Sequence, residues 1–61
     1  SNEEKVLQFI REHLMITRKE TQTLLEVSQS TAGRILKAMV DSGQIKQIGG
    51  SRTTRYELRK E

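Results

Sequence analysis

Residues Thr17–Gly43 read TRKETQTLLEVSQSTAGRILKAMVDSG, and this stretch predicts two helices with a short connection between them. Thr17 is followed three places later by Glu20, which is the form of a capping box at the start of a helix. Ser28 suits the N-cap of the next helix, and Gly43 suits its end as a left-handed C′ residue. Because only about three residues separate the two helices, they must cross steeply, as in a helix-turn-helix.

Apolar residues recur at helical spacing along one face of each helix, which predicts the faces that pack inward. The first helix runs to about Leu25, and its inward residues are Thr21, Leu24 and Leu25. The inward residues of the second helix are Ala32, Ile35, Leu36, Met39 and Val40. Gly33 lies within that helix although glycine costs about 0.5–1 kcal/mol there relative to alanine, so its presence requires a reason. Close approach of the helix to a sugar-phosphate wall would be such a reason.

Upstream of this stretch, residues 3–14 predict a further helix with a capping box formed by Ser1 and Glu4. The apolar stripe of this helix consists of Val6, Leu7, Ile10 and Leu14, widened by Phe9. Met15–Thr17 is short and contains β-branched residues, so we expect an extended connector that pairs with a later hairpin.

Downstream, the hydrophobic period changes to that of a β-hairpin. Ile45–Ile48 is predicted as one strand, residues 49–52 as the turn and Thr53–Leu58 as the second strand. Alternation along the second strand places Tyr56 and Leu58 inward and leaves Arg55 in water. The order of elements predicts an α+β fold, in which a three-helix helix-turn-helix core is followed by a C-terminal β-hairpin wing.

Residues 1–61 are expected to form a single domain. Ser1-Asn2 looks like the remnant of an expression tag, which suggests a domain excised from a longer protein. Hydrophobic residues make up 33% of the chain and aromatic residues 3%, enough for a thin aliphatic core and too little for a cofactor pocket. We therefore expect no cofactor and no small-molecule ligand in this domain.

The residue inventory argues against metal sites, catalysis and membrane insertion. The chain has no cysteine and one histidine, His13, which is expected to lie on the surface at the end of its helix. No nucleophile with a base, no paired carboxylates in a pocket and no phosphate loop can be assembled, so an enzyme is not expected. The chain has no apolar run approaching the ~20 residues of a membrane span, and a cytoplasmic setting is the default.

Positive charge is concentrated in the second half of the chain. The net charge is +3, but residues 1–17 have two basic and three acidic side chains, a sum of −1. Residues 29–55 have five basic side chains against Asp41 alone, a sum of +4. A surface that faces nucleic acid would have to lie in this second half.

Two stretches of the chain resemble bacterial winged-helix transcriptional regulators. Ile16–Ile45 resembles their helix-turn-helix and Ile48–Leu58 resembles their wing, so that the likeness covers residues 3–58. The chain is most similar to the C-terminal winged-helix module of transcriptional regulators of the RecG-like type, and MarR-like regulators share the general pattern. The resemblance implies that the third helix enters the major groove of double-stranded DNA, while the wing contacts the backbone or the minor groove.

The outward residues at the start of the third helix are the candidates for contact with base edges: Gln29, Ser30 and Thr31. Glutamine can pair bidentately with adenine, and the threonine methyl can meet a thymine methyl. Arg34 would reach guanine or phosphate, and Lys37 phosphate only. The alternative is that these residues are a solvated outer face and that Gln29 and Ser30 serve only the first turn of the helix.

Four further basic residues complete the expected DNA interface. Arg52 would enter the minor groove or contact phosphate, and Arg55 would contact the flanking backbone, unless the turn is simply a polar hairpin loop. Arg18 and Lys19 begin the second helix, where positive charge opposes the helix dipole. Their unfavourable position suggests a use such as contact with the DNA backbone.

The function expected from these residues is binding of duplex DNA, as a homodimer or as part of a larger regulator. The competing hypothesis is a protein-interaction or dimerisation module, because fold does not fix function. No exposed apolar patch is evident in the sequence, which counts against that alternative. The sequence does not indicate the operator, the effector or whether the regulator activates or represses.

Overall fold

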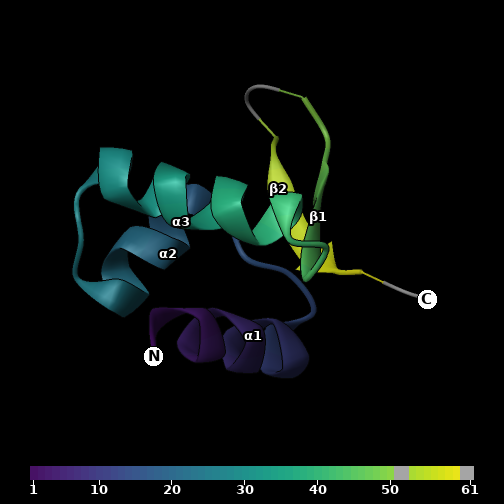
Figure 1. Cartoon of the computed structure of the whole chain (residues 1–61), viewed down its shortest axis with the longest axis horizontal. Coiled ribbons are helices and arrows are strands. Elements are labelled where there is room, and N and C mark those ends of the chain that lie inside the picture. Colours follow the sequence, from purple (N-terminus) through teal and green to yellow (C-terminus); the bar gives the residue numbers. More distant parts are fainter. Residues whose placement is uncertain (51–52, 60–61) are drawn as a thin grey trace.

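The computed structural model describes residues 1–50 and 53–59, and its elements follow the expected order (Figure 1). The helices and strands are α1 (Asn2–His13), α2 (Arg18–Leu25), α3 (Gln29–Asp41), β1 (Ile45–Ile48) and β2 (Arg55–Leu58). In Figure 1, α1 lies along the side of the molecule opposite α3, and the hairpin stands at the C-terminal end of α3. The chain therefore has the α+β layout of a winged helix.

Each helix begins at a capping residue that the sequence identifies. The Ser1 hydroxyl accepts a hydrogen bond from the Glu4 N–H at 3.3 Å. Thr17 and Glu20 form a complete capping box, with side chain to backbone distances of 3.1 and 2.9 Å. The Ser28 hydroxyl accepts from the backbone of α3 at 3.2 Å. These bonds satisfy N–H groups that have no partner within the helix, so they fix where the helices start.

Glycine fixes the end of α3. Gly43 has φ 84, and its N–H donates to the Val40 carbonyl at 3.0 Å. The next N–H, from Gln44, reaches back to the Met39 carbonyl at 3.0 Å. This pair of bonds is a Schellman motif, which requires a left-handed residue that glycine adopts at little cost. The expectation that Gly43 ends the helix is confirmed.

The end of α1 departs from the expectation that Leu14 continues the apolar stripe. The helix ends at His13, and Leu14 is a left-handed C-cap with φ 77 whose N–H donates to the Ile10 carbonyl. The positive φ turns the side chain away from the stripe, so 75% of Leu14 is exposed. Val6 and Ile10 alone of the predicted stripe are buried, while Leu7 is half-buried.

The connector between α1 and α2 pairs with the hairpin, as expected. Ile16 and Tyr56 exchange two backbone hydrogen bonds of 2.9 and 2.8 Å, so the Ile16 backbone lines the outer edge of β2. On its other edge β2 pairs antiparallel with β1, in a register that places Gln47 opposite Tyr56. Met15–Thr17 thus joins the first helix to the wing.

The second strand is shorter than predicted. It begins at Arg55 rather than at Thr53, because the Thr53 N–H and the Thr54 hydroxyl both donate to the Gly50 carbonyl. These two residues belong to the turn. Gly49 has φ 90, and a Cβ there would stand 2.7 Å from the Thr53 carbonyl oxygen, so only glycine fits.

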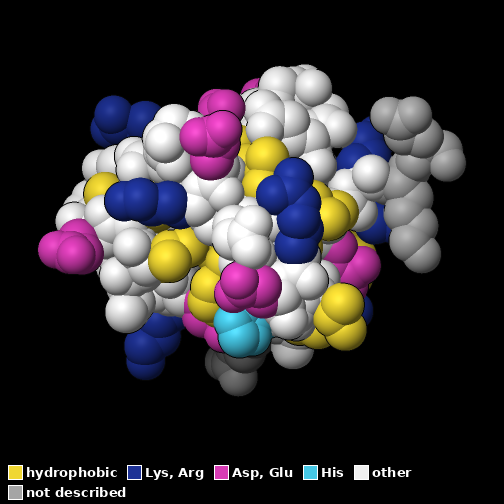
Figure 2. Space-filling view, turned by 90° about the horizontal axis from the view of Figure 1, so that it is seen from below, with side chains coloured by type: hydrophobic (Ala, Val, Ile, Leu, Met, Phe, Trp, Pro, Cys, Tyr) yellow, Lys and Arg dark blue, Asp and Glu magenta, His cyan; other side chains and the backbone are white. Residues whose placement is uncertain are grey.

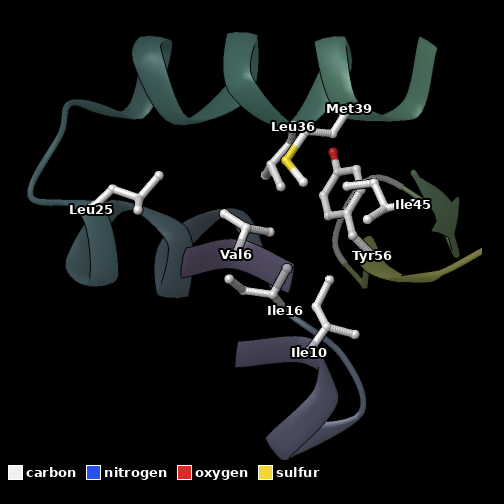
Figure 3. Close-up of a cluster of buried hydrophobic side chains, with 8 residues drawn as sticks. All are labelled: Val6, Ile10, Ile16, Leu25, Leu36, Met39, Ile45 and Tyr56. Atoms are coloured by element: carbon white, nitrogen blue, oxygen red, sulfur yellow. The ribbon is translucent and has the colours of Figure 1, made fainter. Parts of the chain in front are cut away.

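One aliphatic core joins all five elements and the connector (Figure 3). Its eight members are Val6, Ile10, Ile16, Leu25, Leu36, Met39, Ile45 and Tyr56. Of the other predicted inward residues, Thr21 and Ala32 are buried, whereas Leu24, Ile35, Val40 and Leu58 are half-buried. Each fully buried large aliphatic side chain contributes about 1.5–3 kcal/mol, so a few residues stabilise the whole fold.

Candidate nucleic-acid interface

A groove runs along the exposed flank of α3, between the start of α2 and the hairpin. It consists of two adjoining depressions that share Arg18, Gln29, Gln47 and Tyr56. The first depression follows α3, and the second follows the first turn and a half of α2. We call the two together the α3 groove. Figure 3 shows the Tyr56 ring packed beside Ile45 in the core, with its hydroxyl directed toward α3.

The charged side chains that line the α3 groove are mostly basic. They are Arg18, Lys19 and Lys37, together with the acidic Asp41. Lys37 Nζ lies 3.6 Å from Asp41 Oδ2, and both side chains are largely exposed, so this ion pair contributes little to stability. Asp41 is the single acidic residue among the described residues that line the groove.

The three residues predicted at the start of α3 do not share one surface. Gln29 and Ser30 are exposed and line the groove. Thr31 is half-buried on another side of the helix and does not line it. Its Oγ1 accepts a hydrogen bond of 3.1 Å from the Ser28 hydroxyl, which also caps the helix. The Thr31 hydroxyl thus belongs to the capping arrangement.

Arg34 is exposed but lies outside the α3 groove. It lines a shallow depression between α3 and the N-terminus of α1, together with Glu3, Ile35 and Ala38. Arg34 follows Ser30 by four residues. Four residues rotate the side chain by about 40° more than one full helical turn, and this extra rotation directs Arg34 toward α1. Lys37, three residues further, returns to the groove.

Of the two arginines predicted in the wing, the structure describes only Arg55. Arg52 lies outside the described residues. Arg55 is on the face of β2 opposite Tyr56, and its Nε lies 3.4 Å from a carboxylate oxygen of Glu57. Its side chain is 37% exposed, and its Nε is buried with no hydrogen-bond partner among the described residues, so Arg55 is only partly in water, whereas the sequence predicts full exposure. It does not line the α3 groove.

Arg18 reaches across from α2 to α3. A Cβ placed on Gly33 would lie 3.7 Å from Arg18 Nε and 3.9 Å from Arg18 Cζ, and among the described residues these are the only atoms within 4 Å apart from its chain neighbours and its own helix backbone. The missing side chain of Gly33 therefore faces a guanidinium group. The sequence offered no signal for this contact, because the two residues are fifteen positions apart and on different helices.

Comparison with known protein families identifies the class to which this protein belongs. The model of the family described as "Transcriptional regulator DIP2311-like, C-terminal domain" matches residues 6–59. The chain belongs to this family. It is thus a domain of a transcriptional regulator, a class that is not enzymatic, in agreement with its winged-helix fold. No curated protein and no solved structure matches the chain.

The groove of this regulator domain contains residues that sequence reasoning missed. They are the polar side chains of Gln22, Thr23, Gln47 and Thr54. Gln47 shares a strand face with Ile45, and this alternation was the available signal. Of the two strands, only the second was assigned inward and outward faces from the sequence, so Gln47 was not considered. Gln47 lies near the tip of the hairpin, beyond the core, and its side chain therefore lines the groove.

The opposite side of the regulator domain has a different character. Figure 2, seen from below with α1 in front, shows acidic, basic and apolar side chains interspersed. Leu14 and Met15 are the large apolar residues left exposed in the described part of the chain, at 75% and 38%. The apolar groups in this view are separated by charged ones, so they form no continuous patch. No helix in the described part of the chain is long and apolar enough to cross a membrane.

Proposed function

We propose that this regulator domain binds duplex DNA through the α3 groove, with α3 in the major groove. The observation that supports the proposal is the composition of the groove. Three elements contribute basic or amide side chains to it, and its one acidic residue is paired with Lys37. Phosphates require cations and base edges require paired donors and acceptors, and both kinds of group line this surface.

The proposed contacts follow from position. Gln29 and Ser30 are exposed at the N-terminal turn of α3, where a helix-turn-helix meets base edges. Lys19 and Lys37 stand on the two sides of the groove and would contact phosphates of the two strands. In this arrangement Arg34, beside α1, and Thr31 lie outside the groove, and we assign them a minor share of the contact.

The wing would contribute less through Arg55 than the sequence suggests. An arginine paired with Glu57 must lose that partner before it contacts phosphate, whereas Arg52 is assigned to the backbone or minor groove on sequence grounds alone. Since one such module makes a small interface, we expect tight binding only from a homodimer or larger assembly. From the resemblance to bacterial regulators we propose that such an assembly acts in a bacterial cytoplasm.

A salt titration tests the proposal. Fluorescence anisotropy of a labelled random-sequence duplex would be measured against the 61-residue chain between about 50 and 200 mM salt. If about five phosphates are neutralised, log K falls against log salt with a slope near −4 to −5. Absence of binding at micromolar concentration, or an affinity that salt leaves unchanged, contradicts the proposal.

A pair of charge reversals locates the interface. Lys37→Glu places a second acid beside Asp41 in the groove, and we expect at least about a tenfold loss of affinity. Lys5→Glu makes the same change of charge on the exposed face of α1, away from the groove, and is the matched control. Equal losses from the two variants would mean that binding follows net charge and not the α3 groove.

A further inference from the structure

Arg18 occupies a place that the helix dipole disfavours. It is the first residue of α2, and the nearby N–H groups are already engaged by Thr17 and Glu20 in the capping box. A cation at this position gains nothing from its own helix. Its guanidinium does not pair with a carboxylate within ion-pair distance in the described part of the chain. The fold of α2 therefore gives no reason for an arginine here.

The contact with α3 gives the guanidinium a defined position. Gln29, Gly33 and Lys37 are spaced by four residues and form one row along the flank of α3 that faces the groove. Arg18 lies over the middle of this row, against Gly33. Because Gly33 has no side chain, there is room for the planar guanidinium beside the reading helix at this point.

The neighbours of this guanidinium are groups that suit base edges. Arg18, Gln29 and Gln47 come from three different elements and line both depressions of the groove. Lys19, one residue further along α2, lines the second depression alone and has the flexible ammonium that suits phosphate. The two basic residues at the start of α2 thus occupy different positions, one against α3 and one on the outer wall.

We propose that Arg18 is a specificity-determining residue, which reads a guanine in the major groove beside α3. This inference rests on the proposed function. Arginine pairs bidentately with O6 and N7 of guanine, and the pairing requires a fork held in one orientation. The Arg18 side chain already lies beside α3 at Gly33 before DNA binds, so less side-chain freedom is lost on binding.

Selection of bound sites from random duplex DNA, followed by affinity measurement on the selected site, tests the inference. The proteins compared are the wild type, Arg18→Lys, Arg18→Ala and Arg11→Ala. Alanine has no donor, so Arg18→Ala should lose the guanine at one position of the consensus, whereas lysine keeps the charge without the planar fork and should weaken that preference. Affinity for the wild-type site should fall about 5- to 150-fold in Arg18→Ala and by less in Arg18→Lys, and Arg11→Ala, on the exposed face of α1, should resemble the wild type.

The opposite result has a distinct pattern. If Arg18 contacts phosphate, Arg18→Ala retains the wild-type consensus and weakens all sequences alike while reducing the salt slope by about 1. That pattern overturns the inference and leaves DNA binding by the α3 groove intact. A wild-type chain that enriches no duplex overturns the proposed function and this inference together. Because Arg18 is exposed, circular dichroism should show that all variants keep the fold.

Discussion

Gly33→Ala should stabilise this domain although the glycine lies in the helix proposed to read DNA. Gly33 has no positive φ, so alanine introduces no backbone strain. The new methyl would lie 3.7 Å from Arg18 Nε, an ordinary van der Waals distance, and no backbone atom of another element lies within 4 Å. What remains is the helix propensity, which favours alanine by about 0.5–1 kcal/mol.

The gain should be visible as a shift in the thermal midpoint. For a domain of this size 1 kcal/mol corresponds to about 4–8 °C, so we expect Tm to rise by about 2–8 °C. Differential scanning calorimetry or thermal circular dichroism measures the shift, and urea unfolding gives the free energy directly. A lower Tm would refute the reasoning, because it would mean that the Arg18 side chain cannot tolerate the methyl.

The same variant tests why glycine is present. In the structure the missing side chain faces Arg18 rather than open space, so DNA affinity should change less than about threefold. A variant that is more stable but binds DNA about tenfold more weakly would show that recognition needs the glycine, either because the methyl displaces Arg18 or because α3 approaches a sugar-phosphate wall closely. The two measurements on one protein separate packing from recognition.

Three further substitutions are expected to lower stability, to raise stability and to raise DNA affinity, respectively. Gly49→Ala combines a φ of 90 with a Cβ 2.7 Å from a carbonyl oxygen, so unfolding in urea should show a loss of at least about 1–2 kcal/mol. Gly50→Ala, with no other described residue within 4 Å of its Cβ, is the control and should change little. Leu14→Gly relieves a left-handed leucine whose side chain is 75% exposed, and Tm should rise by an amount equivalent to about 1 kcal/mol. Asp41→Asn removes the acid from the groove and frees Lys37, so DNA affinity should rise about two- to fivefold at 50 mM salt and less at 200 mM. An unchanged affinity at low salt would place Asp41 outside the electrostatic reach of the DNA.

Local sequence patterns are enough to predict the helices and strands and most of the residues at which they begin and end. Thr17 with Glu20, Ser28 and Gly43 act through hydrogen bonds to residues three to five positions away. Such contacts are local, so the pattern of residue types is enough to predict them. In the same way, the apolar spacing of α3 predicts the second helix of a helix-turn-helix, and the two glycines before residue 51 predict the turn of the hairpin that follows.

The tertiary structure decided which side chains share a surface. Arg18 meets Gly33, and Gln47 enters the same groove as Gln29, although these pairs are 15 and 18 positions apart in the chain. Arg34 lies on the other flank of the same helix, and Arg55 is paired with Glu57. These positions depend on the angles at which α2, α3 and the hairpin pack on one small core. Core packing sets those angles through contacts spread over the whole chain, and local sequence patterns do not encode them.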